Sequence, residues 1–267
     1  MIVVGELINS TRKKIKEAME KEDAEYLKEL AEKQDKAGSD FIDVNAGAFV
    51  LNELDKLKWA LEVVQETTKK PIAIDSPNPK AIELGLKLHK NGKPLINSIS
   101  MESERWKNVL PLAVENDAYV LGLCIDDNGI PEDSETRLKI ADKIINGLLK
   151  EGKKIEDIAI DPITTPLSVN TNYGLIVMDT IKKIKQNFPE VKTITGLSNI
   201  SYGLPARKQI NRAFIVACMV NGLDGALIDP LDTIMMSMIK ATEALLNKDT
   251  FCSNYLKAFR QGLIVKN

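Results

Sequence analysis

The stretch TITGLSNIS (Thr193–Ser201) begins with a short run suited to a buried strand and then becomes polar abruptly. The strand residues give way to Gly196, and Ser198 and Asn199 follow at once. The same change recurs along the chain, in IDVNAG, IAIDSPN, LINSIS and IAIDPI. Repetition of this unit indicates several similar strands that each end in a carboxylate or an amide.

Short apolar runs alternate with longer segments whose apolar residues recur at three- and four-residue spacing. The short runs predict strands at Met1–Gly5, Phe41–Asn45, Pro71–Asp75, Pro94–Asn97, Tyr119–Ile125, Asp157–Asp161, Thr193–Leu197 and Gly225–Asp229. The periodic segments predict helices at Ala24–Ala37, Leu54–Thr67, Pro79–His89, Glu104–Asn116, Glu135–Lys150, Leu175–Asn187, Gln209–Val220 and Thr233–Leu246.

The strands are almost continuously apolar, which is typical of parallel strands that are covered on both faces. Several helices are followed by a glycine shortly before the next strand, namely Gly38, Gly92 and Gly152. Eight strand–helix units in a chain of 267 residues favour an α/β fold of the closed (β/α)8 TIM-barrel type. We expect one domain over residues 1–267, with an extra C-terminal helix in TFCSNYLKAFRQGL.

Composition excludes several classes of function. The formal net charge is −2, and the 28% of charged residues mix both signs, so a nucleic-acid-binding surface is not expected. No apolar run reaches the roughly 18 residues that a membrane helix needs. The three cysteines are widely spaced, which predicts reduced thiols in a cytoplasmic protein rather than disulfides or a zinc site.

The only histidine, His89, is predicted to end a helix. A Ser-His-Asp triad is therefore excluded as the source of activity, because no other histidine could act as its base.

Polar residues follow nearly every predicted strand, and in a TIM barrel they would surround the carboxyl-end mouth where such enzymes react. An aspartate in this place is also the usual N-cap of the next helix, and Asp229 before Pro230 fits that role best. The set as a whole predicts a binding site; it comprises Glu6, Asn9, Asp43, Asn45, Asp75, Asn97, Asp126, Asp161, Ser198, Asn199 and Asp229.

The residue types indicate the ligand. Asp75 and Asp161 lie just before prolines, which hold the chain extended, and a carboxylate there can accept two adjacent N–H groups of a flat heterocycle. Asn97 can both donate and accept. A neutral, polar, planar ligand fits this set better than phosphate, which carboxylates repel. Magnesium is the competing ligand, but no histidine ligand is available and CIDDNG lacks calcium-loop spacing, so we expect no metal.

These motifs carry a family resemblance over nearly the whole chain. The chain resembles the methyltetrahydrofolate:corrinoid protein methyltransferases, a branch of the pterin-binding methyltransferases within the dihydropteroate-synthase-like superfamily, in IDVNAG, IDSPN, AIELGLK, LINSIS, GIPEDSETRL, IDPI, GLSNIS, INRAF and GLDGALID. The resemblance implies a barrel that is usually a homodimer. It also implies methyl transfer between N5 of tetrahydrofolate, as 5-methyltetrahydrofolate, and the cobalt of cobalamin carried by a separate corrinoid protein.

The resemblance also assigns roles to residues. Asp75, Asn97 and Asp161 would bind the aminopyrimidine edge of the pterin, with Glu6 and Asp43 in the same substrate-binding set. Gly196 and Ser198 would line the pocket, Asn199 would be the catalytic residue beside N5, and Arg207 would lie near the folate tail or the mouth. The chain departs from the family at Leu7, Ser10 and Pro77 and in ISYGLPAR, which leaves the corrinoid partner in question.

Two other functions fit parts of the pattern. A dihydropteroate-synthase-like enzyme would share the pterin site, but that family has a Ser-Arg-Lys-type segment after the seventh strand and a late Arg-x-His, and here no histidine follows His89. A folate-binding subunit without turnover would not need an adaptable amide at Asn199. The nucleophile of the methyl transfer would belong to the partner, which accounts for the lack of an activated Cys, His or Lys.

Overall fold

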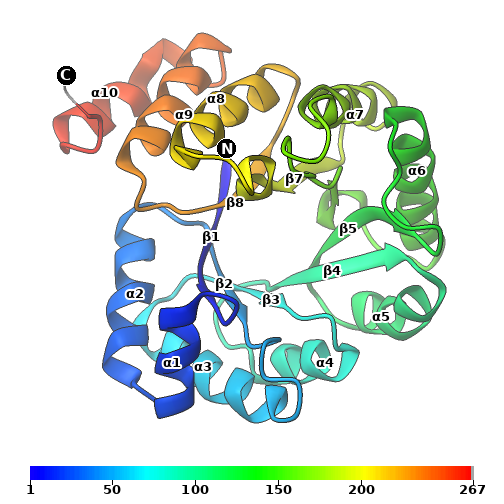
Figure 1. Cartoon of the computed structure of the whole chain (residues 1–267), viewed down its shortest axis with the longest axis vertical. Coiled ribbons are helices and arrows are strands. Elements are labelled where there is room, and N and C mark those ends of the chain that lie inside the picture. Colours follow the sequence, from blue (N-terminus) through cyan, green and yellow to red (C-terminus); the bar gives the residue numbers. More distant parts are fainter. Residues whose placement is uncertain (266–267) are drawn as a thin grey trace.

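The computed structural model describes residues 1–265 and shows a closed barrel of eight parallel strands surrounded by helices (Figure 1). The strands follow one another around the barrel in chain order, and β1 pairs with both β2 and β8. Their bounds are β1 Ile2–Asn9, β2 Phe41–Asn45, β3 Ile72–Asp75, β4 Leu95–Met101, β5 Tyr119–Asp126, β6 Ile158–Asp161, β7 Lys192–Gly196 and β8 Gly225–Ile228. The predicted (β/α)8 barrel is confirmed.

Each predicted helix is present. The helices are α1 Lys13–Lys21, α2 Ala24–Lys36, α3 Glu53–Thr67, α4 Pro79–Leu88, α5 Ser103–Glu115, α6 Ser134–Lys150, α7 Tyr173–Asn187, α8 Arg207–Val220, α9 Thr233–Leu245 and α10 Ser253–Arg260, with short 3-10 helices η1 Ile155–Asp157, η2 Leu197–Ser201 and η3 Thr250–Cys252. The additional C-terminal helix is α10. Helix α1 is not among the predicted helices. None of the helices within residues 1–265 is long and apolar enough to cross a membrane.

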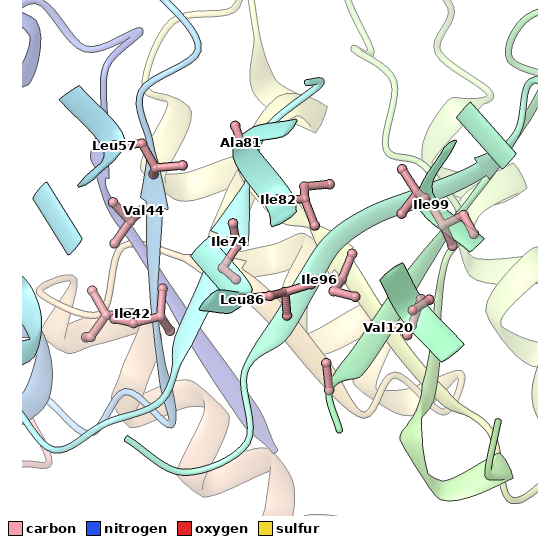
Figure 2. Close-up of a cluster of buried hydrophobic side chains, with 14 of the residues drawn as sticks. Ile42, Val44, Leu57, Ile74, Ala81, Ile82, Leu86, Ile96, Ile99 and Val120 are labelled. Carbon is pink, nitrogen blue, oxygen red and sulfur yellow. The ribbon is translucent and has the colours of Figure 1, made fainter. Parts of the chain in front are cut away.

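The largest apolar core lies between the strands and the helices that cover them. Figure 2 shows part of it, where Ile74 and Ile96 face Ile82 and Leu86 of α4. These side chains are at most 9% exposed, and each contributes about 1.5–3 kcal/mol by leaving water. Outward-facing strand residues therefore hold the helices in place, and inward-facing residues are left to build the interior.

A separate apolar cluster fills the barrel interior, and it sets the position of the polar mouth. It includes Val4, Ala73, Leu95, Ala159 and Ile194, all buried. Side chains on a strand alternate between its two faces, so the residue two places further along also points inward. Those next inward positions are occupied by Glu6, Asp75, Asn97, Asp161 and Gly196.

One predicted helix cap is wrong. Asp229 does not cap α9; its Oδ1 accepts from the Leu231 amide at 2.9 Å, in a turn of its own. The N-cap is Asp232, whose side chain accepts from the Met235 amide at 3.1 Å and is held by Arg212 at 2.8 Å. The helix begins at Thr233, as predicted, but the residue that caps it is Asp232 rather than Asp229.

The predictions for His89, for two of the glycines and for the cysteines can be compared with the structure. His89 is the C-cap of α4, and burial lowers its pKa. Gly38 and Gly152 follow helices with φ of 95° and 90°, a conformation that glycine adopts without steric cost. The cysteines are free thiols: Cys124 and Cys218 are buried and Cys252 is exposed.

Candidate functional site

Polar side chains at the carboxyl ends of β2 and β3 and within β4 are joined in pairs. Asn97 Nδ2 donates to Asp43 Oδ1 at 3.1 Å, and Asn45 Nδ2 donates to Asp75 Oδ2 at 2.9 Å. Ser10 Oγ donates to the Asn45 side-chain oxygen at 3.1 Å. Because each amide is bound to a carboxylate, these predicted residues form two fixed polar pairs on this side of the mouth.

A cavity of about 650 Å³ opens beside these pairs, and Asp75, Asn97, Arg105 and Leu123 are among the residues that line it. Pockets for small ligands occupy roughly 300–1,000 Å³, so a bicyclic ring would fit. Among residues 1–265, no hydrogen bond reaches Asp75 Oδ1. The cavity therefore offers a ligand one carboxylate oxygen that still has both lone pairs.

Asp161 is the last residue of β6, and its side chain accepts hydrogen bonds from three donors. Thr195 Oγ1 donates to Oδ1 at 2.8 Å, the Ile163 amide donates to the same oxygen at 2.7 Å, and the Gly196 amide donates to Oδ2 at 3.1 Å. A Cβ added to Gly196 would meet no protein atom within 4 Å. The space over Gly196 is therefore open to a ligand that approaches the backbone beside Asp161.

A third group lies where β1 meets the loop after β7. Glu6 binds Arg12 at 2.8 Å, and Ser198 Oγ donates to Glu6 Oε2 at 3.4 Å. Arg207 Nη2 donates to the Ser198 carbonyl at 2.7 Å. Glu6 is also close enough to Asp43 to raise the pKa of that carboxyl, which connects this group to the pairs at β2–β4. The hydrogen bonds of Arg207 hold the loop after β7.

The predicted catalytic residue, Asn199, is exposed in η2 at the mouth. Its Nδ2 donates to the Thr164 carbonyl at 2.7 Å, and no described residue in 1–265 donates to its Oδ1. The Thr164 hydroxyl lies 2.9 Å from the Thr195 hydroxyl, which in turn binds Asp161. Asn199 is thus connected to Asp161 through two threonines, and its amide oxygen is left as an acceptor.

Burial perturbs the acids of the mouth. It raises the pKa of Asp75 from 3.8 to about 6, although the Asn45 hydrogen bond and the Arg105 charge oppose this. It raises the pKa of Glu6 from 4.5 to about 7, against the charge of Arg12. Burial also raises the pKa values of Asp43 and Asp161. Near neutral pH, the mouth therefore contains carboxyl groups that can gain or lose a proton.

Several contributors were missed in the sequence. Arg105 lines the cavity, Arg12 pairs with Glu6, and Thr164 and Thr195 connect Asn199 to Asp161. Arg105 and Arg12 lie at the starts of helices, where a basic residue usually faces solvent. No local pattern marks these residues; only the closure of the barrel brings them to the mouth. Within residues 1–265, no group of three or more His, Cys, Asp and Glu side chains could hold a metal ion.

Comparison with known proteins connects this geometry to a family. The sequence matches the pterin binding enzyme family over residues 5–229. A methylcorrinoid:tetrahydrofolate methyltransferase from Eubacterium limosum is 37% identical over 267 residues, which cover 99% of this chain and 98% of the relative. A methionine synthase from Mycobacterium tuberculosis is 28% identical over 90% of this chain, which spans only 21% of that longer protein.

Solved structures share the same barrel. Dihydropteroate synthase from Xanthomonas albilineans, in complex with 7,8-dihydropteroate, superposes with a TM-score of 0.68 over 93% of both chains at 14% identity. The enzyme from Thermus thermophilus gives a TM-score of 0.66 at 17% identity, over 92% of this chain and 93% of that one. At these identities the likeness establishes the fold alone. The near-complete sequence match is what assigns the family, and the chain belongs to the pterin-binding enzymes.

Proposed function

We propose that the chain is a methyltransferase that moves a methyl group between the cobalt of a corrinoid, carried by a separate protein, and N5 of tetrahydrofolate. The observation that carries the proposal is the arrangement of Asp75, Asn97 and Asp161, inward-facing residues at one mouth of the barrel. The 37% identity to a methylcorrinoid:tetrahydrofolate methyltransferase supports the same substrate pair and the direction towards tetrahydrofolate.

The pterin would be bound through its aminopyrimidine edge. That edge presents adjacent N–H donors, which match carboxylate oxygens, and Asp75 Oδ1 has no donor among residues 1–265. Asn97, whose Nδ2 is engaged by Asp43, would offer its amide oxygen as an acceptor. Asp161 would complete the site from β6, with the open space over Gly196 admitting the flat ring.

In the direction of tetrahydrofolate methylation, the N5 lone pair forms the new bond to the methyl carbon while the carbon–cobalt bond breaks and its electron pair stays with cobalt. N5 then carries positive charge and releases its proton. The Asn199 Nδ2 atom is fixed on the Thr164 carbonyl, so Oδ1 is the atom available to accept from N5–H as charge develops. One such hydrogen bond is worth about 3 kcal/mol, or about 10²-fold in rate.

The larger share of the acceleration would come from holding N5 against the methyl group on cobalt. The chain contributes the placement of the pterin and the acceptor at Asn199, and the corrinoid arrives as a substrate on its own protein. Glu6, whose pKa is raised to about 7 and whose Oε2 accepts from Ser198 next to Asn199, is the candidate to take the proton on towards solvent.

We expect the protein to be a cytoplasmic homodimer. Exposed apolar side chains on the α9–α10 side of the molecule support a protein contact there: Leu245 is 79% exposed, Phe251 94% and Leu256 46%. Apolar side chains gathered on a surface are typical of such contacts.

The test is a stopped-flow assay with free methylcobalamin and tetrahydrofolate, which follows the absorbance of cobalt as cob(I)alamin forms. We expect enzyme-dependent turnover, and Asn199→Ala should lower its rate about 10²-fold while tetrahydrofolate still binds. Asn146→Ala, on the exposed face of α6, is the matched control and should react like the wild type. Absence of enzyme-dependent turnover would contradict the proposed function, and an unchanged Asn199→Ala rate would contradict the role of Asn199.

A further inference from the structure

Arg105, near the start of α5, binds the backbone on two neighbouring strand ends. Its Nη1 donates to the Pro77 carbonyl at 2.6 Å, and its Nη2 donates to the Ser76 carbonyl at 2.9 Å. The same Nη2 also donates to the Ser98 carbonyl. Ser76 and Pro77 follow Asp75 directly, and Ser98 follows Asn97. One guanidinium therefore connects the backbone after both residues.

Arg137, near the start of α6, binds the backbone that follows the third strand, β6. Its Nη1 donates to the Pro162 carbonyl at 2.8 Å and to the Ile163 carbonyl at 2.7 Å, and its Nε donates to the Pro131 carbonyl at 2.9 Å. Pro162 and Ile163 follow Asp161 directly. The side chain is 0% exposed, so its hydrogen bonds are made entirely inside the protein.

Both arginines direct their charge at carbonyl groups. Neither forms an ion pair within 4 Å in the part of the chain that the structure describes, and the Arg137 Nη2 atom is buried without a partner there. Burying a cation without a contact carboxylate is costly. The hydrogen bonds to backbone carbonyls offset this cost, so each guanidinium is tied to the backbone positions that it contacts.

The loop that Arg137 holds has an unusual backbone. Ile163 has φ of 61°, a left-handed conformation that a β-branched residue rarely adopts. Its amide donates to Asp161 Oδ1 at 2.7 Å while its carbonyl accepts from Arg137. The arginine thus secures a strained conformation that directs the Ile163 amide at Asp161.

We propose that Arg105 and Arg137 are positioning residues of the pterin site, which orient the Asp75, Asn97 and Asp161 side chains by fixing the backbone that follows each of them. The inference rests on the proposed function, because it names these three side chains as the pterin-binding groups. Arg137 lies in GIPEDSETRL, a motif for which the site itself supplies no other use.

The positive charges of the two arginines also act on the carboxylates whose backbone they hold. Arg105 lowers the pKa of Asp75, opposing burial and the nearby Glu53 charge. Arg137 lowers the pKa of Asp161, which burial raises, alongside the donors already described. Other charged groups also act on this set: Asp43 repels Asp75, Glu102 faces Arg105, and Asp133 faces Arg137. Each arginine therefore also favours the ionised form of the carboxylate that it positions.

Calorimetric titration with tetrahydrofolate between pH 5.5 and 8 tests the inference. Arg105→Met and Arg137→Met should each weaken binding about 10-fold or more. The midpoint of the acid-side loss of binding should also move to higher pH, which a purely structural role would not cause. Arg105→Lys keeps the charge and should restore the midpoint towards that of the wild type while recovering only part of the affinity.

Lys153→Met is the matched control. Lys153 is also buried and donates to backbone carbonyls, those of Ala113 and Asn116, but at the opposite end of the barrel. It should lower thermal stability and leave tetrahydrofolate affinity unchanged. The proposal would be overturned if Arg105→Met folds, binds tetrahydrofolate with native affinity and keeps the acid-side midpoint of the wild type. It would also be overturned if Lys153→Met weakened tetrahydrofolate binding as much as the arginine variants do. If Arg137→Met fails to fold, the Arg105→Met result alone tests the proposal, because Arg105 is partly exposed and its replacement disturbs the core less. A wild-type protein that does not bind tetrahydrofolate would instead remove the proposed function.

Discussion

Glu6 shows how a residue at the mouth acquires its chemistry from its surroundings. The side chain is 15% exposed, between Arg12 and Ser198, and burial raises its pKa to about 7. Arg12 favours the ionised form but does not offset the loss of water. A carboxyl that takes up a proton near neutral pH suits the proposed reaction, in which N5 would lose one. The raised pKa follows from burial rather than from residue type.

The raised pKa of Glu6 makes stability depend on pH. The folded protein binds this proton more tightly than the unfolded chain, in which the pKa of Glu6 is 4.5. The bound proton therefore stabilises the fold fully below pH 4.5, and this stabilisation is lost as pH rises through about 7. Glu6→Gln cannot titrate. Relative to the wild type, its free energy of unfolding should therefore increase by about 1–3 kcal/mol between pH 4.5 and pH 8.

Urea unfolding at both pH values measures this difference. Glu20→Gln, on the exposed face of α1, is the control and should show no change in the difference from wild type. A Glu6→Gln difference that stays constant across the range would show that Glu6 is ionised in the folded protein already at low pH, and the raised pKa would be wrong.

The placement of some candidate site residues could be predicted from the sequence, because it depends on neighbouring residues of the same strand. Asp75 and Asp161 are the last residues of their strands, and Asn97 follows the apolar residues Leu95 and Ile96 of β4. A two-residue alternation places all three side chains inward. Arg105 and Arg137 could not be found this way. Their partners are backbone carbonyls on other strands, which no residue type in the sequence marks.

At the scale of elements, burial and periodicity explain both the successes and the misses. The strands could be predicted to within a few residues at their ends, because each is an apolar run bounded by polar residues. The miss at α1 has a physical cause: its nine residues, KKIKEAMEK, are mostly charged, and only Ile15, Ala18 and Met19 are buried. The strand β4 runs on to Met101 because Ile99 and Ser100 pair with β5, which is a tertiary effect.

Close packing of α4 on β3 gives a prediction at this scale. A Cβ at Gly85 would lie 2.7 Å from Ile74 Cγ2, whereas at Gly174, in α7, the nearest atom would be at 3.6 Å. Both Gly→Ala changes gain helix propensity, so the difference between them isolates the clash. Gly85→Ala should be less stable than Gly174→Ala by about 1–3 kcal/mol in urea unfolding. Equal stabilities would mean that α4 can move away from β3 without cost.

For the whole molecule, barrel closure gathers strand ends that are far apart in the chain. The hydrogen bond from Asn97 to Asp43 spans 54 residues, and the contact between Ser198 and Glu6 spans 192. The outer core holds the helices, the inner cluster fills the barrel below, and Asp75 and Asn97 face a cavity of about 650 Å³. The same architecture serves the structural relatives, but the side chains at the mouth decide which reaction it supports.

Calorimetric titration of tetrahydrofolate into the wild type, Asp75→Asn and Asp161→Asn tests the central claim most directly. Each substitution keeps the shape of the side chain and removes one acceptor charge. The wild type should bind one tetrahydrofolate per chain, each variant should bind it more weakly by about 1–3 kcal/mol, and Asp117→Asn, exposed at the other end of the barrel, should bind it normally. Native affinity in both Asp75→Asn and Asp161→Asn would contradict a pterin site at this mouth.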